Sequence, residues 1–204
     1  MTTTVQSNDV KKSRTDIELI ERRIVLCGIT DIMFDRYAGD NKTKLEPWQK
    51  LYLTEDRTIY IPSLNILSFL SAHNTNSAPK RLRDKRQYKD IANACLSFVS
   101  IEPFNIPFIR DGQPIKFGRF DVDVDRTSKV YIHRAVARLD KGIPNPKERP
   151  VIPLPWALEF WLKIYPNKEI KEQEIQNLFT DGGFALGLGT FRGVFGKFRI
   201  ETWE

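Results

Sequence analysis

Four glycines and two cations near the C-terminal end of the chain have residue types and spacing that could bind an anion. They occur in the order Gly187, Gly189, Arg192, Gly193, Gly196 and Lys197. Glycine tolerates positive φ and permits close approach, so main-chain N–H groups and the two cations could together surround a phosphate. A tight turn that uses glycine only for its backbone geometry is the alternative. The cationic donors favour phosphate contact, because a turn alone does not need them.

The residues after this loop alternate as they would in a final strand. Phe195, Lys197, Arg199 and Glu201 would share one face, with Phe198 on the other. We therefore expect Arg199 to join the phosphate contacts. Phe191, Phe195 and Phe198 could stack on bases; Phe195 is the favoured candidate, and for Phe198 core packing is favoured. The pattern predicts a nucleic-acid-binding surface and does not by itself indicate catalysis.

A second group of cations lies in and just before a predicted helix at about 82–98. Its members are Lys80, Arg81, Arg83, Arg86 and Lys89. They could form a solvated helix face, or make sequence-independent, salt-sensitive contacts with a nucleic-acid backbone. In a predicted strand at 129–139, Arg134 and Arg138 are also expected to contact RNA.

No residue pattern identifies a catalytic centre. His133 could act as a general acid or base, but an ordinary partly buried histidine is the favoured interpretation. Asp121, Asp123 and Asp125 would share a strand face and could hold Mg²⁺; an exposed acidic strand is the favoured alternative. No Walker loop, nucleophile elbow, zinc-binding helix or pair of cysteine motifs occurs. We therefore expect neither a metal nor a cofactor.

The composition indicates a basic protein with one substantial core. The 204 residues carry 32 Lys and Arg against 26 Asp and Glu, a net charge of +6, which favours an anionic partner. No apolar run approaches the length of about 20 residues that spans a bilayer, and the N-terminus lacks a signal-peptide pattern. We expect no membrane association and a cytoplasmic location, with Cys27 and Cys95 as free thiols.

The order of predicted elements indicates an α+β fold. Strands are expected at 21–34, 129–139 and 156–165, and hairpins at 51–62 and 104–117, the second with its turn at Asp111-Gly112. Helices are expected at 63–72, 82–98 and 169–180, the last ended by Gly182 and Gly183, and the segment 141–153 is expected to be an irregular connection or an exposed lobe. This order fits a ferredoxin-like antiparallel sheet with two helices covering one face and the other face free to bind. We expect a flexible segment at 1–20 and a single domain at 21–204, with insertions at about 74–150.

Two segments resemble the RAMP superfamily, the RNA-binding proteins of CRISPR antiviral systems. One is the glycine-rich loop between a helix and the last strand; the other is the run Gly28-Ile29-Thr30-Asp31-Ile32-Met33-Phe34, where Asp31 replaces that superfamily's proline. The resemblance covers roughly the first and last 50 residues. It implies a ferredoxin-like (RRM-like) fold, a glycine-rich loop near guide RNA, and side-by-side assembly as a backbone-type subunit, so the partners would be RNA and further subunits.

The resemblance leaves several functions open. Some target-cleaving subunits of this superfamily place a catalytic aspartate after the first strand, and Asp35 or Asp40 could be analogous. Arg36, Lys42 and Lys44 could equally make that loop a phosphate or subunit contact. The leading hypothesis is a non-enzymatic protein that binds single-stranded or guide RNA; single-stranded DNA stays open. The alternatives are a metal-independent endoribonuclease that uses His133 or Tyr131, and a phage protein that binds or mimics a CRISPR complex.

Overall fold

A four-stranded antiparallel sheet forms the centre of the protein. The computed structural model describes residues 18–40, 42–73, 76–119, 130–138 and 144–204, without the side chains of 137, 138 and 144. The central strands lie in the order β11 (Phe198–Trp203), β1 (Ile20–Gly28), β10 (Ala157–Ile164) and β5 (Val99–Glu102), each antiparallel to its neighbour. This is the strand order of a split βαβ unit, and it confirms the predicted α+β, ferredoxin-like fold.

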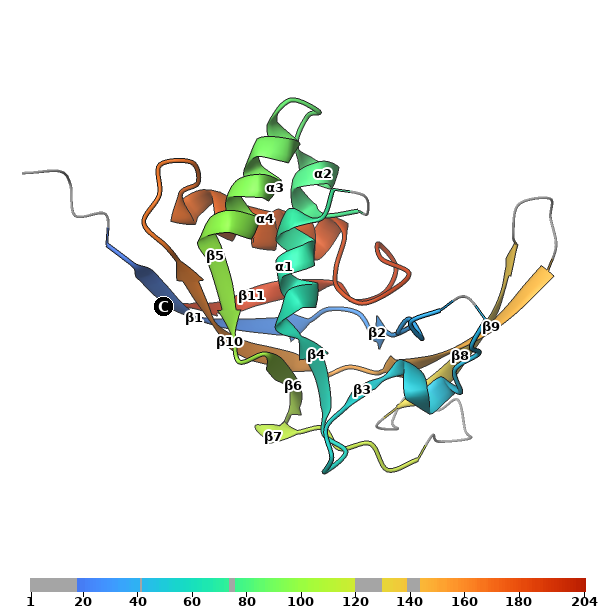
Figure 1. The fold of residues 1–204 in the computed structure, drawn as a ribbon. Helices are drawn as coiled ribbons and strands as arrows, with labels where there is room; N and C mark the ends of the chain where they lie inside the picture. Colours follow the sequence, from blue (N-terminus) through green and yellow to red (C-terminus); the bar gives the residue numbers. More distant parts are fainter. Residues whose placement is uncertain (1–17, 41, 74–75, 120–129, 139–143) are drawn as a thin grey trace, which may run out of the picture.

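The two crossing connections of this unit carry its helices on one side of the sheet (Figure 1). The first connection contains α1 (Ser63–Ser71), α2 (Ala78–Leu82) and α3 (Gln87–Phe98), and the second contains α4 (Glu172–Ala185). The first connection therefore holds the two helices that were predicted at 63–72 and 82–98, as α1 and α3, together with the short helix α2, which was not predicted. Because α3 leads directly into the core strand β5, part of the segment at 74–150 belongs to the ferredoxin-like unit itself.

Aromatic rings fill the space between sheet and helices. Phe69 of α1 lies with its ring centroid 5.6 Å from those of Phe179 and Phe198. Gly182 and Gly183 were expected to end α4, but they lie inside it and are buried. A Cβ on Gly183 would come within 2.5 Å of the carbonyl oxygen of Phe198, so the bare Cα is what lets this helix approach β11.

The predicted first strand at 21–34 divides between two sheets. It forms β1 and then β2 (Ile32–Met33). Trp156 packs over Gly28, where a Cβ would lie 2.3 Å from the indole ring, and its Nε1 donates a hydrogen bond to the carbonyl of Thr30 at 2.8 Å. The chain therefore turns at this point and leaves the central sheet.

Further strands extend the central sheet beyond β10. They are β6 (Asn105–Arg110), β7 (Gln113–Pro114), β4 (Ile59–Pro62) and β3 (Tyr52–Leu53), and β6 joins β10 to β4. Both predicted hairpins are present, since β3 pairs with β4 and β6 pairs with β7. The short helix η1 (Pro47–Lys50) precedes β3.

A long hairpin, β8 (Tyr131–Arg138) and β9 (Pro144–Ile152), pairs with β2 and projects from the body (Figure 1). For the segment 141–153 the prediction of an irregular connection was wrong, because residues 144–152 form a strand, whereas the alternative of an exposed lobe agrees with the projecting hairpin (Figure 1). Pro144, Pro146 and Pro150 alternate, and the carbonyl of Pro150 accepts from Phe34 N on the β2 side. The positions that lack an N–H therefore all face away from β8, which is where a strand tolerates proline.

Three sequence expectations fall wholly or partly outside the described residues. They are the N-terminal segment, apart from its last three residues, the acidic run Asp121, Asp123 and Asp125, and the side chain of Arg138. Within the described part of the chain, no helix combines the length and apolarity that a membrane span requires.

Candidate nucleic-acid interface

The glycine-rich loop closes on itself and on β2. Gly187, Gly189 and Gly196 have φ of 78°, 76° and 74°. A Cβ at Gly196 would lie 2.0 Å from the carbonyl oxygen of Leu188, and one at Gly189 would lie 2.5 Å from that of Met33. Glycine is therefore required at these positions by backbone geometry and close contact.

The N–H groups of this loop bond mostly to carbonyls of the protein. Gly187 N donates to Gly182 O at 2.9 Å, Gly193 N to Leu186 O at 2.7 Å, and Gly196 N to Asp31 O at 2.7 Å. At these three glycines the main chain does not present the free N–H groups that a phosphate cradle needs. The loop joins α4, β2 and β11, in agreement with the tight-turn alternative, and phosphate contact by this loop stays a prediction.

The two cations of the loop have different roles. Arg192 donates from Nη1 to the carbonyl of Asn76 and from Nε to that of Gly189 at 3.2 Å, and burial lowers the pKa of its guanidinium. Arg192 thus ties the loop to the segment before α2. Lys197 donates its main-chain N–H to Thr30 Oγ1 at 3.0 Å, and no bond to its ammonium group occurs within the described residues.

One face of the β8–β9 hairpin turns toward the body. Tyr131 and His133 on β8 share this face with Lys147 and Arg149 on β9, because His133 lies opposite Arg149. His133 meets the ring of Phe195 edge to face, with centroids 5.5 Å apart. Arg149 donates from Nε to Asp35 Oδ2 at 2.8 Å. These contacts fix the hairpin against the glycine-rich loop and the segment after β2.

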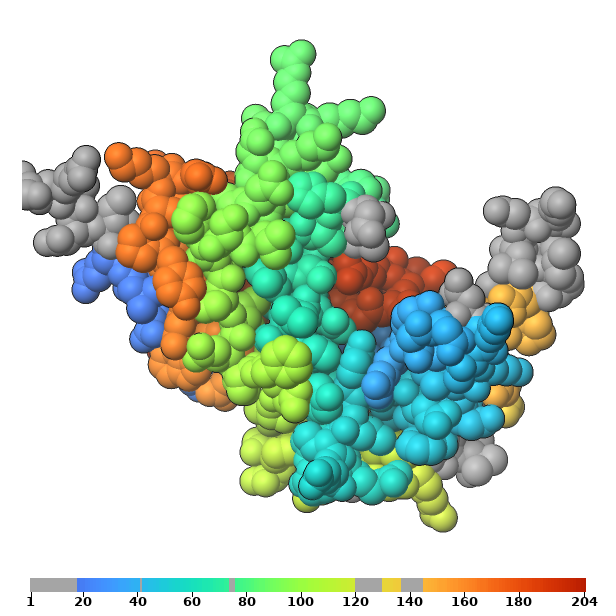
Figure 2. All heavy atoms as spheres, in the orientation of Figure 1, coloured from blue at the N-terminus to red at the C-terminus, as the bar shows by residue number. Residues whose placement is uncertain are grey.

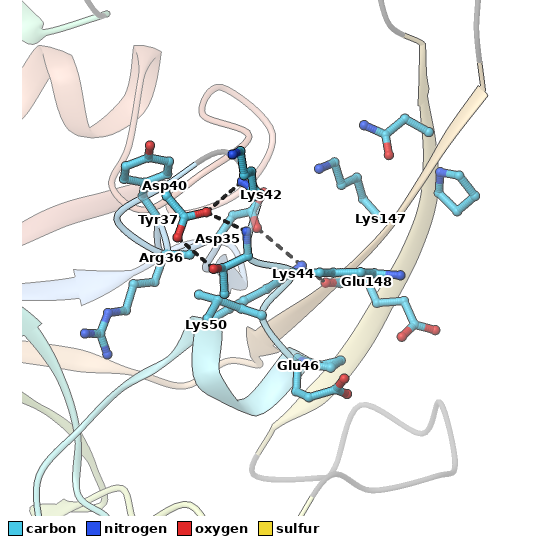
Figure 3. A pocket seen from close by; sticks show the side chains of 16 residues that line it. Asp35, Arg36, Tyr37, Asp40, Lys42, Lys44, Glu46, Lys50, Lys147 and Glu148 are labelled. Carbon is cyan, nitrogen blue, oxygen red and sulfur yellow. Dashed lines mark hydrogen bonds and ion pairs between the residues drawn. The ribbon is translucent and has the colours of Figure 1, made fainter.

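A groove of about 810 Å³ lies between residues 35–50 and the start of β9. Figure 3 shows Lys42 and Lys147 on opposite sides of it, one from each wall. The side chains that line it are mostly charged: Asp35, Arg36, Asp40, Lys42, Lys44, Glu46, Lys50, Lys147 and Glu148. We call it the cationic groove, for the reason given next.

The carboxylates of the cationic groove are engaged, whereas three of its lysines are available. Asp35 is paired with Arg149 and, at 3.4 Å, with Lys50. Glu148 is paired with Arg134, Asp40 accepts from the main chain of Lys42 and Thr43, and Glu46 forms a capping box with Gln49. Within the described residues, no hydrogen bond or ion pair engages the ammonium groups of Lys42, Lys44 and Lys147. The lining has five cations and four carboxylates, so the groove is slightly positive, and these three ammonium groups are available to an anion.

The basic group at residues 80–89 forms a separate surface. Lys80 donates to the carbonyl of His73 at 2.9 Å, and Arg83 is paired with Glu174 at 3.0 Å. Arg81, Arg86 and Lys89 are exposed, and the α2–α3 region projects from the body (Figure 2). Only part of the predicted cluster is thus available to a ligand.

Arg199 lies on the open face of the central sheet, which is acidic. It is paired with Glu201 at 2.8 Å. Among the described residues that form ion pairs on or beside this face, carboxylates outnumber cations: Glu21, Glu102, Glu159, Glu201 and Glu204 against Arg23, Lys163 and Arg199. The expectation that this face is free to bind an RNA backbone is therefore not supported by its charge. The structure does not bring Arg199 together with the cationic groove.

The catalytic candidates have structural partners. Asp35 is held between Arg149 and Lys50, and His133 is packed on Phe195 with its Nδ1 buried and without a hydrogen bond among the described residues. No group of three or more potential metal ligands occurs within the part of the chain that the structure describes. These positions offer no acid–base pair of the kind that catalysis requires.

Sequence reasoning missed Lys147. It lies in the proline-rich segment that was predicted to be irregular, so no strand pattern placed it opposite Lys42. The alternation of prolines at 144, 146 and 150 was the one available signal that this segment could be a strand, with hydrogen bonds to a neighbouring strand along one edge.

Comparisons with known proteins bear on the fold. No protein-family model matches the chain, and no curated protein matches it. The chain is similar to one in the cryo-EM structure of the type III-B Cmr-beta complex bound to cognate target RNA, with a TM-score of 0.51 and 10% sequence identity. The match covers 92% of this chain and 61% of that chain. At this identity the likeness shows a shared fold.

Proposed function

We propose that this protein is a RAMP-type subunit that binds single-stranded RNA, such as a guide RNA, within a multi-protein ribonucleoprotein. The cationic groove carries this proposal. It lies between the segment that follows β2 and a projecting hairpin, and within the described residues the ammonium groups of its Lys42, Lys44 and Lys147 have no hydrogen bond or ion pair. The fold supports the same function, since the similar chain comes from an RNA-bound CRISPR complex.

The groove suits a phosphate backbone better than base pairs. Lysine ammonium groups bind phosphate oxygens as point charges and read no sequence. Lys42 and Lys147 approach from opposite walls, so a strand lying between them would meet a cation on each side (Figure 3). Binding of this type releases counterions, and for single strands the logarithm of affinity falls by about 0.7 per contacted phosphate for each tenfold rise in salt.

A titration with labelled single-stranded RNA over a range of salt concentrations tests this proposal. The test variant is Lys42→Ala/Lys147→Ala. The control is Lys168→Ala/Lys171→Ala, which removes the same charge from the exposed connection between β10 and α4, at the other end of the molecule (Figure 1). We expect the groove variant to bind at least about tenfold more weakly and with a salt slope smaller by about 1.4, from two lost phosphate contacts.

We expect the control to bind as the wild type does. Equal losses in both variants would show only a general charge effect. Absence of RNA binding by the wild type at low salt would contradict the proposed function.

A further inference from the structure

Phe191 is an exposed aromatic side chain on a backbone conformation that does not favour it. Its φ is 53°, in the left-handed region that side-chain-bearing residues rarely adopt, and 60% of its surface is accessible. Residues held in such conformations cluster at binding and catalytic sites. Four glycines surround Phe191 in this loop, yet at this position the chain keeps an aromatic ring.

Two further aromatic rings follow Phe191 in a series of ring contacts that leads into the protein. The Phe191 centroid lies 6.1 Å from that of Phe195, and the Phe195 centroid lies 5.5 Å from that of His133. Phe195 and His133 are only partly accessible, so Phe191 presents the outermost ring of the series. The three rings come from two elements, because His133 belongs to the projecting hairpin.

The turn that carries the outer ring is fixed by hydrogen bonds. Phe195 N donates to Phe191 O at 3.3 Å, and Gly193 N donates to Leu186 O at 2.7 Å. Arg192 secures the same turn to the carbonyl of Asn76. The main chain that carries the ring therefore needs little ordering when a ligand arrives, which lowers the entropic cost of binding.

The ring series lies next to the cationic groove. On the hairpin, Lys147 is opposite Ala135, one position beyond His133 on the same face. On the body, the loop is bonded to Met33 through Thr190 N at 2.8 Å, two residues before the groove wall begins at Asp35. A nucleotide whose phosphate contacts Lys147 would therefore lie close to these aromatic rings.

We propose that Phe191 is a stacking surface for an unpaired nucleobase, with Phe195 and His133 as its supports. This inference rests on the proposed function and assigns a base contact to the strand that the groove would hold by its phosphates. Stacking on an aromatic ring tolerates any sequence because every base has a π face. The contact adds affinity without adding charge, which separates it experimentally from the groove lysines.

The test uses single-stranded RNA in which 2-aminopurine replaces one base at successive positions. Phe191→Gly removes the ring and suits the positive φ, so it spares the turn; Phe191→Trp keeps a stacking surface. Val194→Ala is the matched control, since Val194 is 58% exposed in the same turn. Fluorescence quenching on binding reports stacking, and affinity and salt slope are measured on the same samples.

We expect the wild type and Phe191→Trp to quench the probe at one or more positions. Phe191→Gly should lose that quenching and about tenfold in affinity, with an unchanged salt slope. Val194→Ala should bind as the wild type does. Unchanged binding and quenching in Phe191→Gly would overturn the stacking role alone. Loss of self-association or of subunit assembly, with RNA affinity retained, would instead assign Phe191 to a protein contact and overturn it too. Absence of RNA binding by the wild type would overturn the proposed function and, with it, this inference.

Discussion

The hydroxyl of Tyr131 donates a hydrogen bond to Asp31 Oδ2 at 2.8 Å and so joins the projecting hairpin to the turn between β1 and β2. The other carboxylate oxygen of Asp31 accepts from Leu154 N at 3.1 Å, and its main-chain carbonyl accepts from Gly196 N at 2.7 Å. One residue therefore connects the hairpin, the segment before β10 and the glycine-rich loop. Asp31 occupies the position where the resembled superfamily has proline, and the structure gives it an anchoring role.

We predict that Tyr131→Phe destabilises the protein by about 1–3 kcal/mol, because it removes a hydrogen bond to a carboxylate. Chemical denaturation measures the change. Tyr165→Phe is the control, since Tyr165 is exposed and its hydroxyl has no hydrogen bond within the described residues. If the two variants unfold at the same denaturant concentration, Asp31 does not anchor the hairpin through Tyr131.

Gly183→Ala should destabilise the fold by about 1–3 kcal/mol, the usual cost of overpacking a core. The added methyl group would meet the main-chain carbonyl of Phe198, which cannot rotate away as a side chain can. Gly118→Ala is the matched change at a glycine with no neighbouring atom within 4 Å. A thermal unfolding midpoint for Gly183→Ala equal to that of the wild type would show that α4 and β11 are not in such close contact.

The thiol of Cys95 predicts a pH dependence of stability. Burial, assisted by the negative charge of Glu174, raises the pKa of Cys95 to about 12, against about 8.5 in an unfolded chain. The folded state therefore keeps this proton to higher pH than the unfolded state. The resulting contribution is fully present below about pH 8.5 and is lost as pH rises towards 12.

Urea denaturation of the wild type and Cys95→Ala at pH 7.5 and pH 10 isolates this contribution. Other groups titrate in both proteins, so the informative quantity is the difference between their free energies of unfolding. We expect the wild type to lose more stability at pH 10 than Cys95→Ala does. A difference that does not change with pH would mean that the thiol is accessible to solvent.

The exposed cations of the α2–α3 region should act only on longer RNA. Arg86 and Lys89 belong to the start of α3, and the α2–α3 region projects from the body apart from residues 35–50 (Figure 2). We predict that Arg86→Glu/Lys89→Glu weakens binding of a long single strand several-fold and leaves unchanged the binding of an oligonucleotide that fills only the groove. Equal losses of affinity for both lengths would contradict this prediction, because they would mean that one short oligonucleotide contacts both surfaces.

The spacing of apolar residues, every second residue in strands and every third or fourth in helices, predicted most of the elements correctly. The alternation in β10 and the spacing of apolar residues in α4 are local properties, and the turn Asp111-Gly112 fixed the hairpin of β6 and β7. The role of Gly183 was misread because it depends on Phe198, which is distant along the helix–loop–strand path. A sequence does not distinguish a glycine that ends a helix from a glycine that lets a neighbouring strand approach the helix closely.

The candidate site was less accessible to sequence reasoning, because most of it depends on pairing between distant segments. Arg192 looks like a phosphate ligand beside its glycines, but its partners are carbonyls, including that of Asn76, which no residue pattern reveals. In the sequence Arg199 likewise looks available to a phosphate, but in the structure it is paired with Glu201 and lies on the acidic face of the sheet. Lys42 and Lys44 were recognised as a possible contact, but Lys147 joined them only through the hairpin.

Photo-crosslinking of 4-thiouridine RNA, with mass spectrometry of the linked peptides, tests the central claim most directly because it reports where the strand lies. We predict cross-links within residues 35–50, within β9 near Lys147, and at or beside Phe191. Cross-links concentrated on the open face of the sheet, around Trp161 and Arg199, would contradict the claim and place the RNA on the acidic face instead.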